Sequence, residues 1–166
     1  EKARKGYTKA IRKRLVLPAH ARVLHTAVEE RLRKLAAYSD VFSYNKITWG
    51  RKSMGVIASG ISYQYAREVF PDASFLKISM TYPLPEKLIK RFARQVKRTV
   101  VIEEGDPILE TEIKAMGIRV TGKARVPLCG ELTPKVLRNS FAKTRKSAKR
   151  SDAVPDRPPV LCPGCP

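Results

Sequence analysis

The feature that most constrains the fold is a unit of a short apolar run, a turn and a helical pattern, which occurs twice in the middle of the chain. In the first copy, residues 54–60 read as a strand bounded by glycine, and apolar residues recur at helical spacing over 61–70. In the second, residues 75–79 form the strand and residues 85–96 the helix, and residues 99–102 add a third strand. Apolar strands that alternate with amphipathic helices are typical of a parallel sheet covered on both faces. We therefore expect an α/β fold, a three-layer αβα sandwich with a mainly parallel sheet.

The segments on either side extend this pattern. Residues 118–121 form a fourth strand candidate, and residues 132–141 carry inward apolar positions for a last helix. Upstream, apolar residues at three- and four-residue spacing over 18–35 predict an amphipathic helix that packs on another surface. Residues 44–50 favour a strand or an extended connector, with the single tryptophan, Trp49, as a packing anchor.

Length and charge limit the classes of protein that remain. The 166 residues suit one domain with flanking segments, and no apolar run approaches the roughly 20 residues of a membrane span. Because the N-terminus also lacks the apolar stretch of a signal peptide, a soluble cytoplasmic protein is expected. The formal net charge is +19, of which residues 1–35 contribute +8 and residues 138–166 contribute +5. Basic flanks can bind nucleic acid or anionic lipid, but they also occur as solvated tails or as faces that meet an acidic neighbour.

Two loops are predicted to meet at the carboxyl edge of the sheet, where open α/β sheets bind ligands. One is the proline-rich loop 80–86, and the other follows the third strand. In the second loop, Asp106 is the expected N-cap and Pro107 the first residue of a helix. Glu103 and Glu104 could supply a general base, although only one of two adjacent side chains on an extended chain faces inward.

Other positions that could carry chemistry have simpler structural interpretations. The turn 59–62 could bind an anion at a helix N-terminus, but a tight turn with serine caps is favoured. His20 and His25 could be zinc ligands or catalytic groups, and surface or capping roles are favoured. Cys129 is most simply a buried or semi-buried thiol. Gly117 is expected to end the preceding helix as a C′ residue.

The last two cysteines, Cys162 and Cys165, have the Cys-x-x-Cys spacing that lets two thiolates bind one zinc ion or one iron–sulfur cluster. They follow a basic, proline-rich linker rather than a strand and a helix, which disfavours a redox dithiol. Two ligands cannot close a four-cysteine site, so they form a possible but incomplete metal site. We assign no residue as catalytic from the sequence, and it leaves any cofactor-binding residues unknown.

Taken together, several stretches resemble the alpha subunit of indolepyruvate ferredoxin oxidoreductase, and the resemblance extends over nearly the whole chain from residue 17 onward. These stretches are Gly-Val-Ile-Ala-Ser-Gly-Ile-Ser-Tyr at 55–63, Met-Thr-Tyr-Pro-Leu-Pro at 80–85, Val-Ile-Glu-Glu at 101–104 and Arg-Pro-Pro-Val-Leu-Cys-Pro-Gly-Cys-Pro at 157–166.

The resemblance implies that residues 1–50 are the exit from a pyrimidine-binding domain. Residues 51–142 would be a domain similar to the transketolase C-terminal domain, and residues 143–166 a linker into a pyrophosphate-binding domain. The family decarboxylates aryl 2-oxoacids such as indolepyruvate oxidatively on thiamine pyrophosphate and magnesium. It passes electrons through iron–sulfur clusters to ferredoxin and releases the acyl group as a coenzyme A thioester, and its alpha subunit works with a beta subunit. In related two-subunit enzymes, a Cys-Pro-Gly-Cys pair at the place of Cys162 and Cys165 helps to hold a four-iron cluster.

The domains that hold thiamine pyrophosphate in the family are absent or barely begun here. The sequence also shows no magnesium–diphosphate motif, no complete cluster motif and no dinucleotide fingerprint. We therefore expect this piece to bind no cofactor and to be inactive alone. Its expected role is scaffolding, with the loops at Tyr82-Pro83 and Glu103-Glu104 approaching neighbouring domains or subunits.

Two alternatives remain open. The chain could be a module whose basic ends bind nucleic acid, with an affinity that falls steeply as salt rises. The scarcity of aromatic residues within the basic runs, where Tyr7 stands alone, disfavours this reading. A stand-alone redox or metal protein would need a dimer to bring together four ligands from Cys162 and Cys165.

Overall fold

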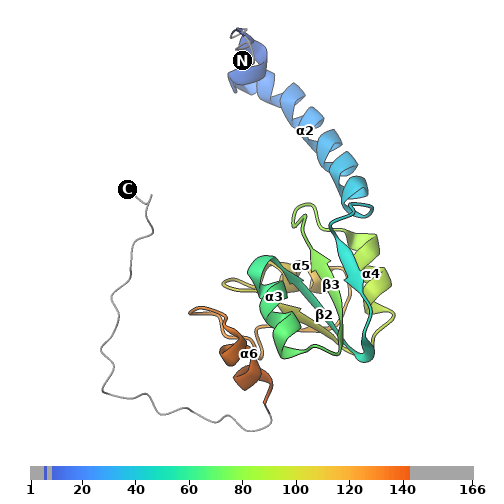
Figure 1. Ribbon diagram of the computed structural model, residues 1–166. Coiled ribbons are helices and arrows are strands. Elements are labelled where there is room, and N and C mark those ends of the chain that lie inside the picture. The colour runs from blue at the N-terminus through green and yellow to red at the C-terminus, as the bar shows by residue number, and fades with distance from the viewer. Residues whose placement is uncertain (1–5, 7–8, 143–166) are drawn as a thin grey trace, which may run out of the picture.

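The computed structural model describes residue 6 and residues 9–142. Helices and strands alternate through most of this part of the chain (Figure 1). In chain order the elements are α1 (Ile11–Arg14), α2 (Pro18–Ser39), β1 (Lys46–Thr48), β2 (Arg51–Ser59), α3 (Gly60–Val69), β3 (Ala73–Ile78), α4 (Glu86–Ala93), β4 (Thr99–Ile102), α5 (Ile108–Ala115), β5 (Val120–Thr121) and α6 (Pro134–Phe141).

The strands form one five-stranded sheet in the order β1-β3-β2-β4-β5. Strands β2, β3, β4 and β5 are parallel, and β1 pairs antiparallel with β3 at one edge. The central strand, β2, places Ile57 opposite Leu76 of β3 and Val101 of β4. The predicted mainly parallel sheet is therefore confirmed. Strand β1 lies within residues 44–50, for which a strand or a connector was expected.

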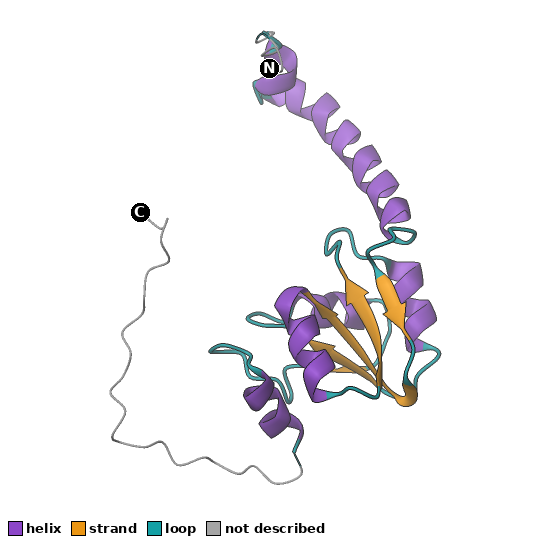
Figure 2. Ribbon diagram, in the orientation of Figure 1, coloured by secondary structure: helices purple, strands orange, loops and turns teal. Residues whose placement is uncertain are grey.

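Helices cover both faces of the sheet, α3 and α6 on one side and α4 and α5 on the other (Figure 2). Alternate residues of each strand point to opposite faces, so the sheet separates two apolar clusters. The predicted three-layer αβα sandwich is confirmed. On the α3/α6 side the cluster includes Val56, Ala58, Phe75, Val100, Ile102, Ala66 and Leu137, and on the α4/α5 side Ile57, Leu76, Ile78, Val101, Leu88, Ile89, Phe92, Leu109 and Ile113.

Close packing explains the glycine inside β2. A Cβ atom at Gly55 would lie 2.9 Å from Cε1 of Phe92 and 2.8 Å from Cγ2 of Val96. Such distances are shorter than van der Waals contact, so the α4 side of the core requires glycine here. The same aromatic ring of Phe92 stacks on Trp49 with centroids 5.6 Å apart, which supports the expected packing role of the tryptophan.

The helix ends follow the sequence signals only in part. Gly117, with φ of 80°, follows α5, and the N–H groups of Gly117 and Ile118 donate to the carbonyls of Lys114 and Ile113. This is the Schellman arrangement expected of a C′ glycine. The expected serine cap before α3 is wrong, because the Ser59 side chain accepts no capping hydrogen bond.

Helix α2 stands away from the sandwich as an arm, and α1 folds against its far end (Figure 1). Of its residues, Ser39 alone is buried, at the end that joins the sheet domain. Val23 is 73% exposed and Leu35 is 41% exposed, so the apolar stripe predicted to pack on another surface is largely open. No helix of the described part is long and apolar enough to cross a bilayer.

Candidate functional site at the carboxyl edge of the sheet

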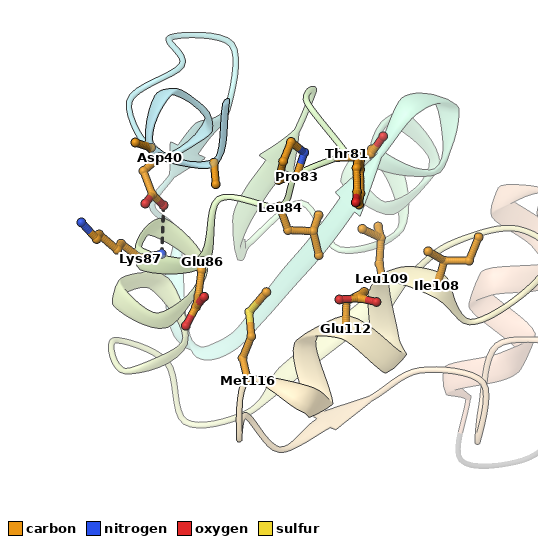
Figure 3. Close-up of a pocket in the computed structure, with 13 residues that line it drawn as sticks. Asp40, Thr81, Pro83, Leu84, Glu86, Lys87, Ile108, Leu109, Glu112 and Met116 are labelled. Atoms are coloured by element: carbon orange, nitrogen blue, oxygen red, sulfur yellow. Dashed lines mark hydrogen bonds between the residues drawn. The ribbon is translucent and has the colours of Figure 1, made fainter. Parts of the chain in front are cut away.

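A cleft of about 650 Å³ opens at the carboxyl edge, where α2 ends and the 80–86 loop meets α5 (Figure 3). Its wall is mainly apolar, from Leu84, Leu109 and Met116, and charged side chains stand around it. The 80–86 loop that the sequence placed at this edge therefore lines the cleft, while the loop after β4 contributes only through α5, the helix that follows it. The lining residues are Ala36, Ala37, Asp40, Thr81, Tyr82, Pro83, Leu84, Glu86, Lys87, Ile108, Leu109, Glu112 and Met116.

Two large apolar side chains of this cleft are turned to solvent. Tyr82 in the loop after β3 is 75% exposed, and Ile108 at the start of α5 is 69% exposed. Single exposed apolar residues are common on protein surfaces, but two beside one apolar cleft are typical of a contact surface. The cleft is therefore better suited to receive another surface than to enclose a small substrate.

Asp40 connects the arm to the cleft. Its Oδ1 accepts a hydrogen bond from the backbone N–H of Lys87 at 2.9 Å (Figure 3) and another from the N–H of Leu88 at 3.2 Å, so it caps the N-terminus of α4. An acid directly after the end of α2 is unfavourable for the dipole of that helix. The role of Asp40 is instead to cap the N-terminus of α4, where a carboxylate is favourable.

Asn45 makes the second connection, from the buried start of the β1 segment. Its Nδ2 donates to the Ser39 carbonyl at 2.8 Å, at the end of α2. Its Oδ1 accepts from the N–H groups of Ser79 at 2.8 Å and Met80 at 3.1 Å, where β3 ends. The amide thus joins the arm, the sheet edge and the cleft loop. We call Asp40 and Asn45 together the arm joint.

Glu103 caps the second helix of the edge. Its side chain is buried, and its two oxygens accept from the N–H groups of Leu109 at 2.8 Å and Glu110 at 2.9 Å. The prediction that Asp106 is the N-cap of this helix is wrong, because no side-chain cap precedes α5 and only the backbone carbonyl of Asp106 bonds to Ile108. The longer glutamate at the end of β4 reaches the same N–H groups from the strand.

The adjacent residues Glu103 and Glu104 point in opposite directions, as expected of an extended chain. Glu103 faces inward, while Glu104 is exposed and accepts a 3.3 Å hydrogen bond from the N–H of Leu132. Both oxygens of Glu103 are already engaged by backbone donors. Structural capping therefore accounts for the carboxylate that the sequence offered as a general base.

Glu110 forms a buried charge network behind the cleft. It accepts from Nζ of Lys114 at 2.6 Å and from the N–H of Lys123 at 2.7 Å, while Nζ of Lys123 donates to the Glu103 carbonyl at 2.6 Å. Burial alone would raise the pKa of Glu110, but the hydrogen bonds and positive charges of the two lysines outweigh it and lower that pKa. A Cβ at Gly122 would lie 2.2 Å from Oε2 of Glu110, so the glycine leaves room for this carboxylate.

The cofactors that the resemblance implies do not fit the cleft. A diphosphate needs cations and free N–H groups, yet Asp40, Glu86 and Glu112 line the cleft with Lys87 as the single cation. The N-termini of α4 and α5 already bind carboxylates. Within residue 6 and residues 9–142, no group of three or more histidine, cysteine or acidic side chains could hold a metal ion.

The remaining candidates are dispersed. His20 contacts a backbone carbonyl of the preceding segment at 3.1 Å, and His25 pairs at 3.2 Å with the exposed carboxylate one turn further along, so both have the surface or capping role favoured from sequence. The prediction of a buried or semi-buried Cys129 is wrong, because this free thiol is exposed in the loop before α6. Cys162 and Cys165 lie outside the described residues.

Sequence reasoning missed Asp40, Asn45 and Glu110. Only Asp40 carried a local signal, since an acid at the end of a helix opposes the helix dipole. Asn45 accepts from backbone N–H groups 34 and 35 residues away, and Glu110 accepts from the N–H of a lysine 13 residues away. Contacts of that range leave no periodic pattern.

Comparison with known proteins gives one consistent group of relatives. The chain is 37% identical to indolepyruvate oxidoreductase subunit IorA of Archaeoglobus fulgidus over 92% of the chain, and 33% identical to the same subunit of Methanothermobacter thermautotrophicus over 90%. It spans 28% and 27% of the length of these relatives. No protein-family model matches the chain.

A solved structure supports the fold. The 2-oxoglutarate:ferredoxin oxidoreductase from Magnetococcus marinus, solved with 2-oxoglutarate, coenzyme A and succinyl-CoA bound, matches with a TM-score of 0.56 and 19% identity. The match covers 74% of this chain and 23% of that protein. The resemblance to the alpha subunit of indolepyruvate ferredoxin oxidoreductase is thus confirmed, with the chain corresponding to about a quarter of the subunit.

Proposed function

We propose that this chain is a segment of a thiamine-dependent 2-oxoacid ferredoxin oxidoreductase and that it acts there as a scaffolding domain. The observation that carries the proposal is the 37% identity to an indolepyruvate oxidoreductase subunit, IorA, which extends over nearly the whole chain. The fold agrees with it, because the matching solved structure is also a 2-oxoacid oxidoreductase.

The proposed substrates of the whole enzyme are indolepyruvate and related arylpyruvates, together with coenzyme A. The reaction is an oxidative decarboxylation that yields an acyl-CoA and reduces ferredoxin, in the cytoplasm. Thiamine pyrophosphate, bound with magnesium, supplies the stabilisation of the carbanion, and iron–sulfur clusters supply the path for electrons. We place these cofactors on other parts of the enzyme, since the cleft described here does not fit a diphosphate.

The proposed division of the chain follows the resemblance. Residues 1–50 would lead out of a pyrimidine-binding domain, residues 51–142 would be the transketolase C-terminal-like domain, and residues 143–166 would lead into a pyrophosphate-binding domain. The scaffolding role is supported by the site itself. Its buried carboxylates cap helices and bind lysines, and they stiffen the carboxyl edge of the sheet.

The cleft is the proposed contact of this domain with a neighbouring domain or with the beta subunit. Tyr82 and Ile108 offer apolar surface there, and the acidic side chains beside them suit a partner segment with apolar and basic residues. Burial of such exposed apolar side chains is a common source of affinity in stable interfaces.

One experiment tests both parts of the proposal. The isolated chain is titrated with thiamine pyrophosphate and magnesium by calorimetry, and the full-length subunit, produced with its beta subunit, is assayed for indolepyruvate- and coenzyme A-dependent reduction of ferredoxin. We expect no binding to the isolated chain and activity from the complex. Tight cofactor binding by the isolated chain would refute the scaffolding role, and a complex inactive on every aryl 2-oxoacid would refute the enzyme assignment.

A variant of the cleft refines the test. Tyr82→Ala in the full-length complex should weaken association with the beta subunit, measured by analytical ultracentrifugation, by about tenfold or more. Tyr44→Ala is the control, because Tyr44 is also exposed but does not line the cleft. Equal effects of the two substitutions would rule out the cleft as the contact with the beta subunit.

A further inference from the structure

The outer face of α4 and the turn after it form a dense patch of positive charge. Glu86 at the start of the helix is the single acid of residues 86–98. We call this surface the cationic α4 face. Its cations are Lys87, Lys90, Arg91, Arg94 and Lys97.

The fold directs these cations outward. Leu88, Ile89 and Phe92 are buried in the α4/α5 side of the core, so the positions between them must face solvent. Lys87, Lys90, Arg91 and Arg94 recur at the three- and four-residue spacing of one helical stripe. The charge is therefore concentrated on one side of the domain.

The domain does not use this charge internally. Among the described residues, the face has one ion pair, between Lys90 and Glu86. Lys87 and Arg91 are a like-charge pair one turn apart, which destabilises a helix, and a lysine in the first turn also opposes the helix dipole. Helix stability thus gives no reason for the arrangement, whereas binding to a negative surface does.

Beside the charges lies a hollow of about 310 Å³, between α4 and the end of α5. Lys90 and Arg94 contribute its charged side. Ala93, Met116 and Ile118 contribute apolar surface, and Gly117 has no side chain that would fill the hollow. A patch with an apolar hollow next to cations can hold an aliphatic side chain while the charges bind flanking carboxylates.

We propose that the cationic α4 face binds an acidic protein surface, with an aliphatic side chain of the partner seated in the hollow. Charge complementarity selects a negative partner, and the apolar hollow favours a polypeptide over a phosphodiester backbone, which has no aliphatic group to fill it. Nucleic acid would also be favoured by an aromatic ring free to stack on bases. Trp49, which contacts α4, is already engaged, because its ring stacks on Phe92 and lies 5.4 Å from Nζ of Lys52. The inference goes beyond the proposed function, since neither the reaction nor the cleft requires this face.

The probes are three polyanions of equal charge: an Asp/Glu peptide with one central leucine, the same peptide with alanine in place of leucine, and duplex DNA. Each is titrated into the 166-residue chain at low salt, with affinity read from fluorescence anisotropy and position from backbone NMR shifts. We expect the leucine peptide to bind several-fold more tightly than the alanine peptide and to shift the amides of Ala93 and Ile118. Binding should weaken as sodium chloride rises.

Matched variants separate this face from the general charge of the chain. Arg91→Gln with Arg94→Gln should weaken binding of the leucine peptide by about tenfold, while Lys9→Gln with Arg12→Gln, an equal change of charge near α1, should weaken it by less than about twofold. All four positions are exposed, so both variants should stay folded, with unfolding temperatures no lower than that of the wild type.

Three results would overturn the proposal. Equal losses in the two double variants would show attraction to net charge alone. Equal affinity for the leucine and alanine peptides would remove the role of the hollow. Tighter binding of DNA than of the leucine peptide, with shifts in α4, would assign the face to nucleic acid instead.

Discussion

At the scale of single residues, the arm joint depends on one buried amide. Asn45 gives its donor to α2 and its acceptor to the end of β3, so a single side chain satisfies backbone groups of two distant segments. No hydrocarbon side chain can do this, and a hydroxyl is too short to span both. The identity of this residue should therefore matter more than its volume.

Asn45→Ala should lower the free energy of unfolding by about 2–4 kcal/mol, because the N–H groups of Ser79 and Met80 lose their acceptor. Urea unfolding measures the change. Asn139→Ala on α6 is the matched control, since Asn139 is exposed, and its effect should stay within about 0.5 kcal/mol. Similar losses in both variants would contradict the role of the amide.

Glu110 should make stability depend on acid. Its pKa is lowered in the folded state from an ordinary value of 4.5, so near that pH the native protein binds fewer protons than the unfolded chain. The stabilisation is complete above the unfolded pKa and is lost as the pH falls through the folded pKa.

Urea unfolding between pH 7 and pH 3 should therefore show a steeper loss for the wild type than for Glu110→Gln. The exposed Glu112→Gln, on the same helix, serves as the control. Parallel curves for the wild type and Glu110→Gln would show that this carboxylate contributes nothing to the acid response.

At the scale of elements, both helices of the carboxyl edge are capped at their N-termini by a carboxylate that comes from outside the helix. Asp40 caps α4 and Glu103 caps α5. The helices consequently start at positions fixed by the arm and by β4, rather than by their own first residues.

Glu103→Ala should destabilise the domain by about 1–3 kcal/mol, since two buried N–H groups of α5 lose their acceptor. Asp106→Ala should change stability by less than about 0.5 kcal/mol, although Asp106 is the cap that the local sequence suggests. Thermal unfolding of the two variants shows which carboxylate caps α5. A larger loss of stability in Asp106→Ala than in Glu103→Ala would identify Asp106 as the cap.

The elements themselves could be read from the sequence, whereas their ends could not. Continuous apolar runs such as 54–58 and 99–102 have to be covered on both faces, and this requirement predicted the layers of the sandwich. Gly117 was readable because a positive φ at a helix end favours glycine. The cap of α5 was not, because Glu103 reaches it through space from another element.

The candidate site was predictable to the same degree. Parallel topology brings the loops after β3 and β4 to one edge, so the place of the cleft followed from strand order. The roles of Asp40 and Asn45 depend on pairs more than 30 residues apart, and the exposure of Cys129 depends on a loop without periodicity. The openness of α2 also escaped prediction, since an apolar stripe does not say what covers it.

At the scale of the whole molecule, the net charge of +19 should make the fold sensitive to salt. Repulsion among unpaired surface cations disfavours the compact state, and it is screened over about 10 Å at 0.1 M salt. The unfolding temperature should therefore rise between about 10 mM and about 150 mM sodium chloride.

The cationic α4 face should account for a measurable part of this response. Replacing Lys87, Arg91 and Arg94 by glutamine should raise the unfolding temperature at low salt and flatten its dependence on salt. A variant that is less stable than the wild type at low salt would show that these cations support the helix.

The arm joint has a further, mechanical consequence. At 1.5 Å of rise per residue, the 22 residues of α2 make a lever about 33 Å long whose pivot lies at Asp40 and Asn45. Tilting such a lever by about 10° displaces its far end by about 6 Å, roughly the pitch of one helical turn. A few hydrogen bonds of Asp40 and Asn45 therefore determine how precisely the far end of α2 is positioned relative to the sheet domain. A small change in their geometry would produce a much larger displacement at that far end.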